Sequence, residues 1–145
     1  MLPTTRTSTP MPHKTAVMTC GCFDPFHVGH LYHFQFARRL GDPLIVAVTK
    51  NGFVHKGEGR PMFDEKERAA VIKALAIVDD VILVESSIEA LALVQPAVFC
   101  IGIEYKHKVR KEDVRYCRTN GIRIEFSDEK TYSSTRIVND LVRQD

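Results

Sequence analysis

The alternation of apolar and polar segments along the chain predicts strands and helices that take turns from one end to the other. Short, nearly continuous apolar runs rich in β-branched residues are typical of strands buried on both faces. Apolar residues spaced three and four apart indicate helices between them. The expected strands cover 15–21, 43–49, 78–86, 97–102 and 122–126, and the expected helices cover 28–40, 64–75, 88–94, 112–120 and 134–142.

Stop and start signals support these boundaries. Gly41 and Pro43 follow the first helical pattern, where glycine ends a helix and proline prevents its continuation. Asp64 and Glu67 have the spacing of a capping box, which predicts the start of the second helix. The segment 51–62, between the expected strand 43–49 and this helix, is rich in glycine and is typical of a loop.

The strict alternation of strand and helix implies a parallel sheet with helices on both faces. We therefore expect a single doubly wound, Rossmann-like α/β domain with a five-stranded parallel sheet over residues 15–145. Residues 1–14 are rich in Thr and Pro and are expected to form a disordered tail. Sheets of this kind bind ligands beyond the carboxyl ends of their strands, at the point where the strand order reverses.

Composition narrows the class of protein. The chain has 145 residues, 44% of them hydrophobic and 26% charged, which suits one globular domain and argues against disorder. No run approaches the roughly 18 apolar residues needed to span a membrane. The first residues lack the apolar segment of a secretory leader, so we expect a cytoplasmic protein. Cysteines 20, 22, 100 and 117 show no C-x-x-C spacing and are expected to be reduced and structural.

Charge points to an anionic ligand rather than to nucleic acid. The net charge is only +2, which is too small for a nucleic-acid binder by bulk electrostatics. The first part of the chain is nevertheless cationic, with seven Lys and Arg against three Asp and Glu up to Arg60. This part contains the stretch with the most distinctive chemistry.

That stretch, GCFDPFHVGH at 21–30, lies where the first strand gives way to the first helix. A helix N-terminus presents unpaired N–H groups and partial positive charge, so it binds phosphate readily. Gly21 and Gly29 let a ligand approach the backbone closely. His27 and His30 are three residues apart in the first turn, and each can donate a hydrogen bond to a phosphate oxygen.

Other interpretations of the histidines fit less well. A zinc site built from His27, His30 and His33 would lack both the H-E-x-x-H pattern and a fourth ligand, so we expect no protein-bound metal. Two polar rings beside glycine and proline are poorly placed for a core pair. The P-loop pattern G-x-x-x-x-G-K-[ST] is absent. A phosphate site of another kind remains the favoured interpretation.

The quoted stretch resembles the H-x-G-H signature of the nucleotidyltransferase superfamily, and the resemblance extends over nearly the whole chain from Thr15. KGEGRPMFDEKER resembles the loop and helix start after strand two in the cytidylyltransferase-like branch. CIGIEY resembles its G-x-[DE]-[YW] turn after strand four, and YSSTRI resembles its I-S-T-T-K-I element at the last helix. Class I aminoacyl-tRNA synthetases share H-x-G-H but are far larger and carry a lysine motif that is missing here.

The resemblance implies an enzyme in which an acceptor phosphate attacks the α-phosphorus of a nucleoside triphosphate in line and pyrophosphate leaves. His27, His30 and Lys56 would be its catalytic residues, with Lys50 as the alternative lysine. The resemblance also implies Mg²⁺ as companion of the triphosphate, and related enzymes are often homodimers. The nucleotide-binding residues that it implies are Cys22, Phe23, Gly29, Arg68, Gly102, Glu104, Ser133, Ser134 and Thr135.

Several of these residues have a plainer interpretation. Lys56 and Arg68 could be exposed loop and helix charges, and the hydroxyls of 133–135 could simply cap a helix. Asp24 is expected to shape the first turn rather than to take part in catalysis. His33 is expected on a partly exposed helix face, and the basic run 105–111 is expected to be a solvated loop.

The substrates stay open at this point. Glycerol-3-phosphate cytidylyltransferases carry R-T-E-G where this chain has Asp128 to Thr131. KGEGRP and GIEY look closer to the adenylyltransferases that make ADP-heptose, and PMFDEKER is similar to archaeal FAD synthetases. We expect a nucleotidyltransferase acting on ATP or CTP and a phosphorylated sugar or polyol, with a nucleotide-binding sensor as the alternative from another class.

Overall fold

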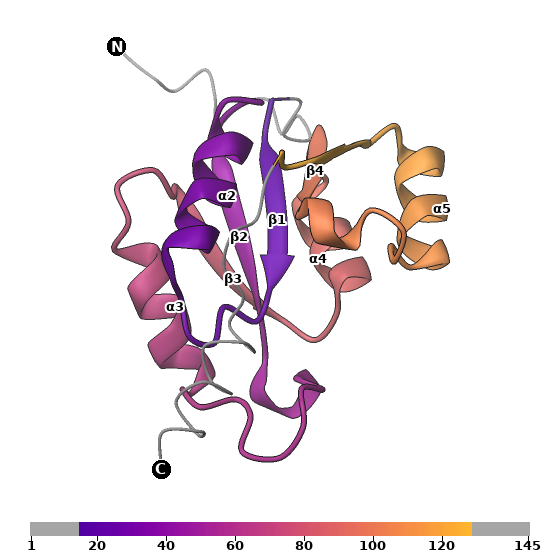
Figure 1. The fold of residues 1–145 in the computed structure, drawn as a ribbon. Coiled ribbons are helices and arrows are strands. Elements are labelled where there is room, and N and C mark those ends of the chain that lie inside the picture. The colour runs from indigo at the N-terminus through magenta and orange to yellow at the C-terminus, as the bar shows by residue number, and fades with distance from the viewer. Residues whose placement is uncertain (1–14, 129–145) are drawn as a thin grey trace.

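Five parallel strands form the centre of the molecule, in the order β3-β2-β1-β4-β5 (Figure 1). The structure is a computed structural model that describes residues 15–128, so the helix expected at 134–142 lies outside the described part. Its elements are β1 (Val17–Gly21), α2 (Val28–Arg38), β2 (Leu44–Thr49), η1 (Asn51–Phe53), α3 (Glu65–Lys73), β3 (Asp80–Val84), α4 (Ser87–Val94), β4 (Val98–Ile101), η2 (Ile103–Tyr105), α5 (Lys111–Asn120) and β5 (Arg123–Phe126).

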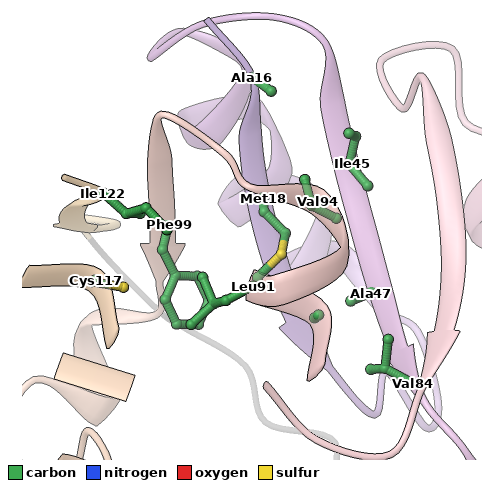
Figure 2. Close-up of a cluster of buried hydrophobic side chains, with 11 residues drawn as sticks. Ala16, Met18, Ile45, Ala47, Val84, Leu91, Val94, Phe99, Cys117 and Ile122 are labelled. Carbon is green, nitrogen blue, oxygen red and sulfur yellow. The ribbon is translucent and has the colours of Figure 1, made fainter. Parts of the chain in front are cut away.

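Helices cover both faces of this sheet, α2 and α3 on one and α4 and α5 on the other (Figure 1). Each face has its own hydrophobic cluster, as expected for strands whose alternate side chains point to opposite faces. Phe34 of α2 and Ile72 of α3 are fully buried in one cluster. Figure 2 shows the other cluster, in which Leu91 of α4 packs with Met18 of β1 and Phe99 of β4. The predicted doubly wound α/β fold is confirmed.

Element boundaries differ slightly from the sequence prediction. The first helix ends at Arg38 rather than at residue 40, and α3 ends at Lys73 rather than at 75. Apolar periodicity continues past both ends because the following turns also contribute to the core. Gly41 is required for a different reason from its expected role as a helix stop: an added Cβ would lie 2.3 Å from the Thr15 carbonyl oxygen.

Candidate active site

A cavity of about 340 Å³ opens where β1 and β4 separate. These neighbouring strands pair only through Val17 with Val98 and Met18 with Phe99, so their carboxyl ends diverge. The strand order reverses at this point, because the chain runs from β1 toward β3 on one side and from β4 to β5 on the other. The lining residues come from both flanks of the gap: Thr19, Cys20, Gly21, Cys22, Phe23, Gly29, His30, His33, Lys56, Ser87, Phe99, Cys100, Ile101, Gly102, Glu104, Tyr105, Lys108, Val109, Arg110, Asp113 and Ser127.

Two histidines cap the start of α2 by a reciprocal pair of hydrogen bonds. The Gly29 N–H donates to His27 Nδ1 at 3.0 Å, and the His27 N–H donates to His30 Nδ1 at 3.2 Å. This is a capping box in which imidazoles replace the usual hydroxyl and carboxylate. Because each Nδ1 accepts, the neutral rings carry their protons on Nε2. The cap therefore fixes both tautomers and makes each Nε2 a hydrogen-bond donor.

Aromatic contacts hold these rings in place. The His27 and His30 rings stack with centroids 3.8 Å apart. The Phe23 ring meets His30 edge-on at 5.1 Å, and Phe26 packs against it at 5.6 Å. Phe23 adopts a φ of 53°, a conformation that bulky residues rarely take and that often marks functional sites. His30 consequently faces the cavity as a preorganised group.

The turn before α2 is anchored by a buried carboxylate. Asp24 is 0% exposed and accepts hydrogen bonds from Met62 N–H at 2.7 Å, Phe63 N–H at 2.9 Å and Arg60 Nε at 3.0 Å. The Arg60 guanidinium also donates to the Asp24 carbonyl oxygen. Burial raises the pKa of this carboxyl, but the two N–H groups and Arg60 outweigh burial and hold it below its usual range. Asp24 thus joins the histidine turn to the segment before α3.

The opposite flank of the cavity begins at η2. An added Cβ on Gly102 would lie 2.4 Å from Glu104 Oε1, so the Glu104 carboxylate folds back over the backbone of Gly102. Tyr105 follows, and burial together with the neighbouring Glu104 raises the pKa of its phenol. Lys108 and Arg110 continue along the rim. The basic run expected to be a solvated loop therefore borders the cavity.

Further along this flank, α4 and α5 contribute a buried polar pair. Ser87, at the start of α4, donates from Oγ to Asp113 Oδ2 at 2.5 Å. Asp113 lies in the first turn of α5 and is 4% exposed. Burial raises the pKa of this carboxyl, and nearby Glu112 adds to the effect, while Ser87 and Arg110 oppose it. Asp113, on the cavity lining, and Asp24, next to the lining residue Phe23, thus have pKa values shifted in opposite directions.

Two of the cysteines on the cavity lining, Cys20 and Cys100, have buried thiols. Burial raises the pKa of Cys20 and of Cys100 to about 12, so both stay protonated at neutral pH. All four cysteines are free. This agrees with the expected structural role of the cysteines.

A cytidylyltransferase-like family profile matches residues 18–140, which is most of the chain. The chain belongs to the cytidylyltransferase-like family. This confirms the superfamily resemblance of the H-x-G-H stretch, and it supports the prediction that the protein is a nucleotidyltransferase enzyme. Within this family, the cavity at the histidine cap is the candidate nucleotide site.

Individual relatives match with moderate identity. The bifunctional protein HldE of Desulfatibacillum aliphaticivorans is 34% identical over 138 residues, covering 88% of this chain and 27% of that protein. The bifunctional protein HldE of Syntrophotalea carbinolica is 38% identical over 96 residues, covering 63% of this chain and 20% of that protein. The chain thus spans about a quarter of the length of these relatives or less.

A solved structure of similar length shares the fold. The lipopolysaccharide core biosynthesis protein from Thermoplasma volcanium GSS1 has a TM-score of 0.66 and 28% identity to this chain. The match covers 82% of this chain and 98% of that one.

The cavity brings together most of the predicted site residues that the structure describes. Ser133, Ser134 and Thr135 lie outside the described residues, so their role stays a prediction. His27 is not among the lining residues; it stacks on the His30 ring and caps α2, and its predicted catalytic role stays a prediction. The predicted residues on the lining are Cys22, Phe23, Gly29, His30, Lys56, Gly102 and Glu104.

Arg68 is not an exposed helix charge. Its side chain is buried, with 3% exposure, and donates from Nε to Phe63 O, from Nη1 to Cys22 O and from Nη2 to Asn51 Oδ1, at 2.8–2.9 Å. The guanidinium ties the residue after the first strand to the loop after β2, so Arg68 is not the exposed helix charge considered as the alternative. Its predicted contact with the nucleotide stays a prediction.

The two candidate lysines separate clearly. Lys56 lines the cavity, whereas Lys50 points to Glu85, with 3.9 Å between Nζ and Oε2. The structure therefore favours Lys56 over Lys50 as the lysine of the site. His33 is a partly exposed residue of α2, as the sequence predicted, and it also lines the cavity and forms a 2.7 Å hydrogen bond with Thr19 Oγ1.

Sequence reasoning missed Ser87 and Asp113. They lie 26 residues apart, and each looks like an ordinary polar residue in the first turn of a helix. No local spacing signals their contact. Within residues 15–128, no group of three His, Cys, Asp or Glu side chains is arranged to hold a metal ion. Over the same range, no helix has the length and apolar character needed to cross a membrane.

Proposed function

We propose that this protein is a sugar-phosphate nucleotidyltransferase that transfers a nucleoside monophosphate from ATP or CTP to a phosphorylated sugar or polyol and releases pyrophosphate. The preferred pair is ATP with a heptose phosphate or a similar sugar phosphate. An oxygen of the acceptor phosphate forms the new bond to the α-phosphorus. The bond from that phosphorus to the bridging oxygen breaks, and pyrophosphate leaves with the electron pair.

The observation that carries this proposal is the reciprocal histidine cap beside the cavity. His30 has one ring nitrogen committed to the backbone and therefore carries Nε2–H as a donor. The ring sits at a helix N-terminus, where the partial positive charge favours an anion. A preorganised donor in this position stabilises the charge that grows on the phosphoryl oxygens during displacement. His27 fixes the orientation of His30, and Lys56 adds a cation from the loop after β2.

The proposed acceptor class rests on two kinds of similarity. KGEGRP and GIEY resemble the adenylyltransferases that make ADP-heptose, and Gly102 and Glu104 of the second motif line the cavity. The similar structure from Thermoplasma volcanium carries the name of a lipopolysaccharide core biosynthesis protein, which is compatible with sugar chemistry.

We expect Mg²⁺ to enter with the triphosphate. The described residues 15–128 hold no cluster of three metal-ligating side chains, so they do not form a resident cation site. Phosphate oxygens are the hard ligands that Mg²⁺ prefers, and the substrate would supply them. No step of the proposed reaction depends on a protein ligand to the cation.

The proposal is tested by pyrophosphate release with Mg²⁺. ATP and CTP are each paired with heptose 1-phosphate, glycerol 3-phosphate, phosphocholine and FMN. We expect release from one pair, and a loss of roughly a hundredfold or more in His30→Ala, which lacks the preorganised donor. His107→Ala is the matched control, because His107 is an exposed histidine that is not part of the cavity lining, and it should keep full activity.

Binding measurements separate the alternatives if release is not observed. Calorimetric titration with each triphosphate would then show either binding or no binding. Binding without turnover on this panel would favour a nucleotide sensor over an enzyme for these acceptors. Absence of binding of both triphosphates would refute the proposed function.

A further inference from the structure

The flank of the cavity built by α4 and α5 holds a carboxyl that the proposed reaction does not use. Asp113 lines the cavity and is 4% exposed. Its Oδ2 accepts the Ser87 hydroxyl hydrogen at 2.5 Å, while Oδ1 has no hydrogen-bond donor among residues 15–128. Native proteins leave few buried acceptors unsatisfied, because an acceptor removed from water without a partner is unfavourable. An unsatisfied oxygen beside a cavity therefore points to a partner that arrives with the ligand.

The surroundings of Asp113 indicate which partner is suitable. A neighbouring cation, Arg110, is directed to Glu112, with Nη1 and Oε1 3.6 Å apart. The thiols of Cys20 and Cys117 also lie near this carboxyl and stay protonated because burial raises the pKa of both. Asp113 forms no ion pair within the described part of the chain. A neutral donor group is thus the natural complement, because a phosphate brings only acceptors and negative charge.

Ser87 extends the same pattern. Its hydroxyl hydrogen is committed to Asp113, so the remaining lone pairs of Oγ can only accept. The two side chains therefore present neighbouring acceptors, one on the carboxyl and one on the hydroxyl. Two adjacent hydroxyl groups of a sugar match this arrangement. Phe99, Ile101 and Val109 supply apolar lining nearby, which suits the carbon face of a sugar ring.

We propose that Asp113 and Ser87 form a hydroxyl-recognition subsite that holds the sugar of a ligand while the histidine cap holds phosphate. This inference rests on the proposed function, because it assumes that a nucleotide or sugar phosphate occupies the cavity. The sugar is either the ribose of the triphosphate or the sugar of the acceptor, and both carry the same hydroxyl chemistry. Asp113 is then a specificity-determining residue of the site.

The test compares ligands that differ by one hydroxyl, using calorimetric binding. One arm uses ATP and CTP against their 2′-deoxy and 3′-deoxy analogues. The other arm uses heptose 1-phosphate and glycerol 3-phosphate against analogues that lack one hydroxyl. Each arm is measured with the unaltered protein, Asp113→Ala, Asp113→Asn and Ser87→Ala. Asp80→Ala serves as the matched control, because Asp80 is an exposed carboxylate on β3.

The expected result is a loss of discrimination. Removing the recognised hydroxyl should weaken binding to the unaltered protein by about tenfold, as expected for a hydrogen bond to a charged group. In Asp113→Ala the same pair of ligands should differ by less than about twofold, and the isosteric Asp113→Asn should lie between. Asp80→Ala should keep the full difference. The arm that shows the effect identifies whether ribose or the acceptor sugar occupies the subsite.

Other outcomes overturn the inference in distinguishable ways. If Asp113→Ala and Asp113→Asn fold and keep the full discrimination in both arms, the subsite is refuted while the proposed function stands. Binding of both kinds of ligand by the unaltered protein, without any preference for hydroxyl groups in either arm, refutes the subsite in the same way. If the unaltered protein binds neither triphosphates nor sugar phosphates, the proposed function and the subsite are both refuted.

Discussion

Two buried carboxyls, Asp24 before α2 and Asp113 in α5, satisfy their hydrogen-bonding positions in different ways. On the flank of β1 and α2, the Asp24 carboxylate accepts from two backbone N–H groups and from Arg60, and all three nitrogens of the Arg68 guanidinium donate. On the flank of α4 and α5, Asp113 has one oxygen paired and one without a donor among the described residues.

This difference distinguishes groups that the protein holds in a fixed orientation for the reaction from groups that recognise a ligand. A group that stabilises a transition state works best when the protein has already fixed its orientation, because no reorganisation is then needed during the reaction. A group that recognises a ligand needs an unsatisfied hydrogen-bonding position in the free protein. The first flank contains interactions of the first kind, around His30, and the second flank contains an interaction of the second kind, at Asp113.

The largest effect on stability is expected from Asp24→Ala. The change removes a fully buried carboxylate and leaves Arg60 Nε and the N–H groups of Met62 and Phe63 without their acceptor. Breaking a buried pair by removing one partner costs about 3–5 kcal/mol. Urea denaturation should show this loss in the free energy of unfolding.

Asp80→Ala provides the control for Asp24. Asp80 also pairs with a cation, Lys73, at 3.1 Å, but both side chains are about 60% exposed. An exposed pair is worth about 0–1 kcal/mol, so this variant should unfold close to the unaltered protein. Equal losses in the two variants would contradict the view that the first flank depends on its internal pairing.

A smaller effect on the free energy of unfolding is expected from pH, and its sign is opposite for Asp24 and Asp113. The folded state lowers the pKa of Asp24, so its stabilising contribution is present above the unfolded pKa of about 3.9 and is lost as pH falls through the folded value. The folded state raises the pKa of Asp113, so ionisation of this carboxyl opposes folding as pH rises through the folded value.

The corresponding measurement is the free energy of unfolding of Asp24→Asn and Asp113→Asn across the acid range. The deficit of Asp24→Asn relative to the unaltered protein should shrink as pH falls. The free energy of unfolding of Asp113→Asn should rise relative to that of the unaltered protein as pH rises toward neutrality. If the free energies of unfolding of the two variants changed with pH in parallel, the pKa values of the two carboxyls would not be shifted in opposite directions.

The smallest effect is expected from Lys108→Ala on the rim. Lys108 is exposed and lines the cavity, so its removal should leave the unfolding curve unchanged. It should weaken triphosphate binding by about threefold at low salt, and the difference should disappear at high salt because exposed charges are screened. A salt-independent loss would instead mean that Lys108 makes a direct, desolvated contact.

Local patterns in the sequence were enough to predict the sheet, its covering helices and the histidine turn. The apolar runs of β1, β2 and β4 reflect burial on both faces, and His27 and His30 meet because they are three residues apart on one turn of helix. Such contacts depend on spacing alone, so a sequence reveals them.

Contacts between distant segments were not predictable in this way. Arg68 looked like an exposed helix charge, but its three acceptors come from residues 22, 51 and 63, which only the folded chain brings together. Ser87 and Asp113 likewise meet through the packing of two helices on one face of the sheet. Whether a polar side chain is buried depends on such packing, and no periodicity encodes it.

The short pairing between β1 and β4 gives a bound ligand a mechanical role. Only two pairs of facing residues in β1 and β4 join the part of the sheet formed by β1, β2 and β3 to the part formed by β4 and β5. A ligand held by His30 of α2 on one side and by η2 on the other would span the gap beyond those pairs. It would link the two parts of the sheet. Hydrogen exchange of the amides in β1 and β4 should therefore slow on binding more than exchange of amides elsewhere.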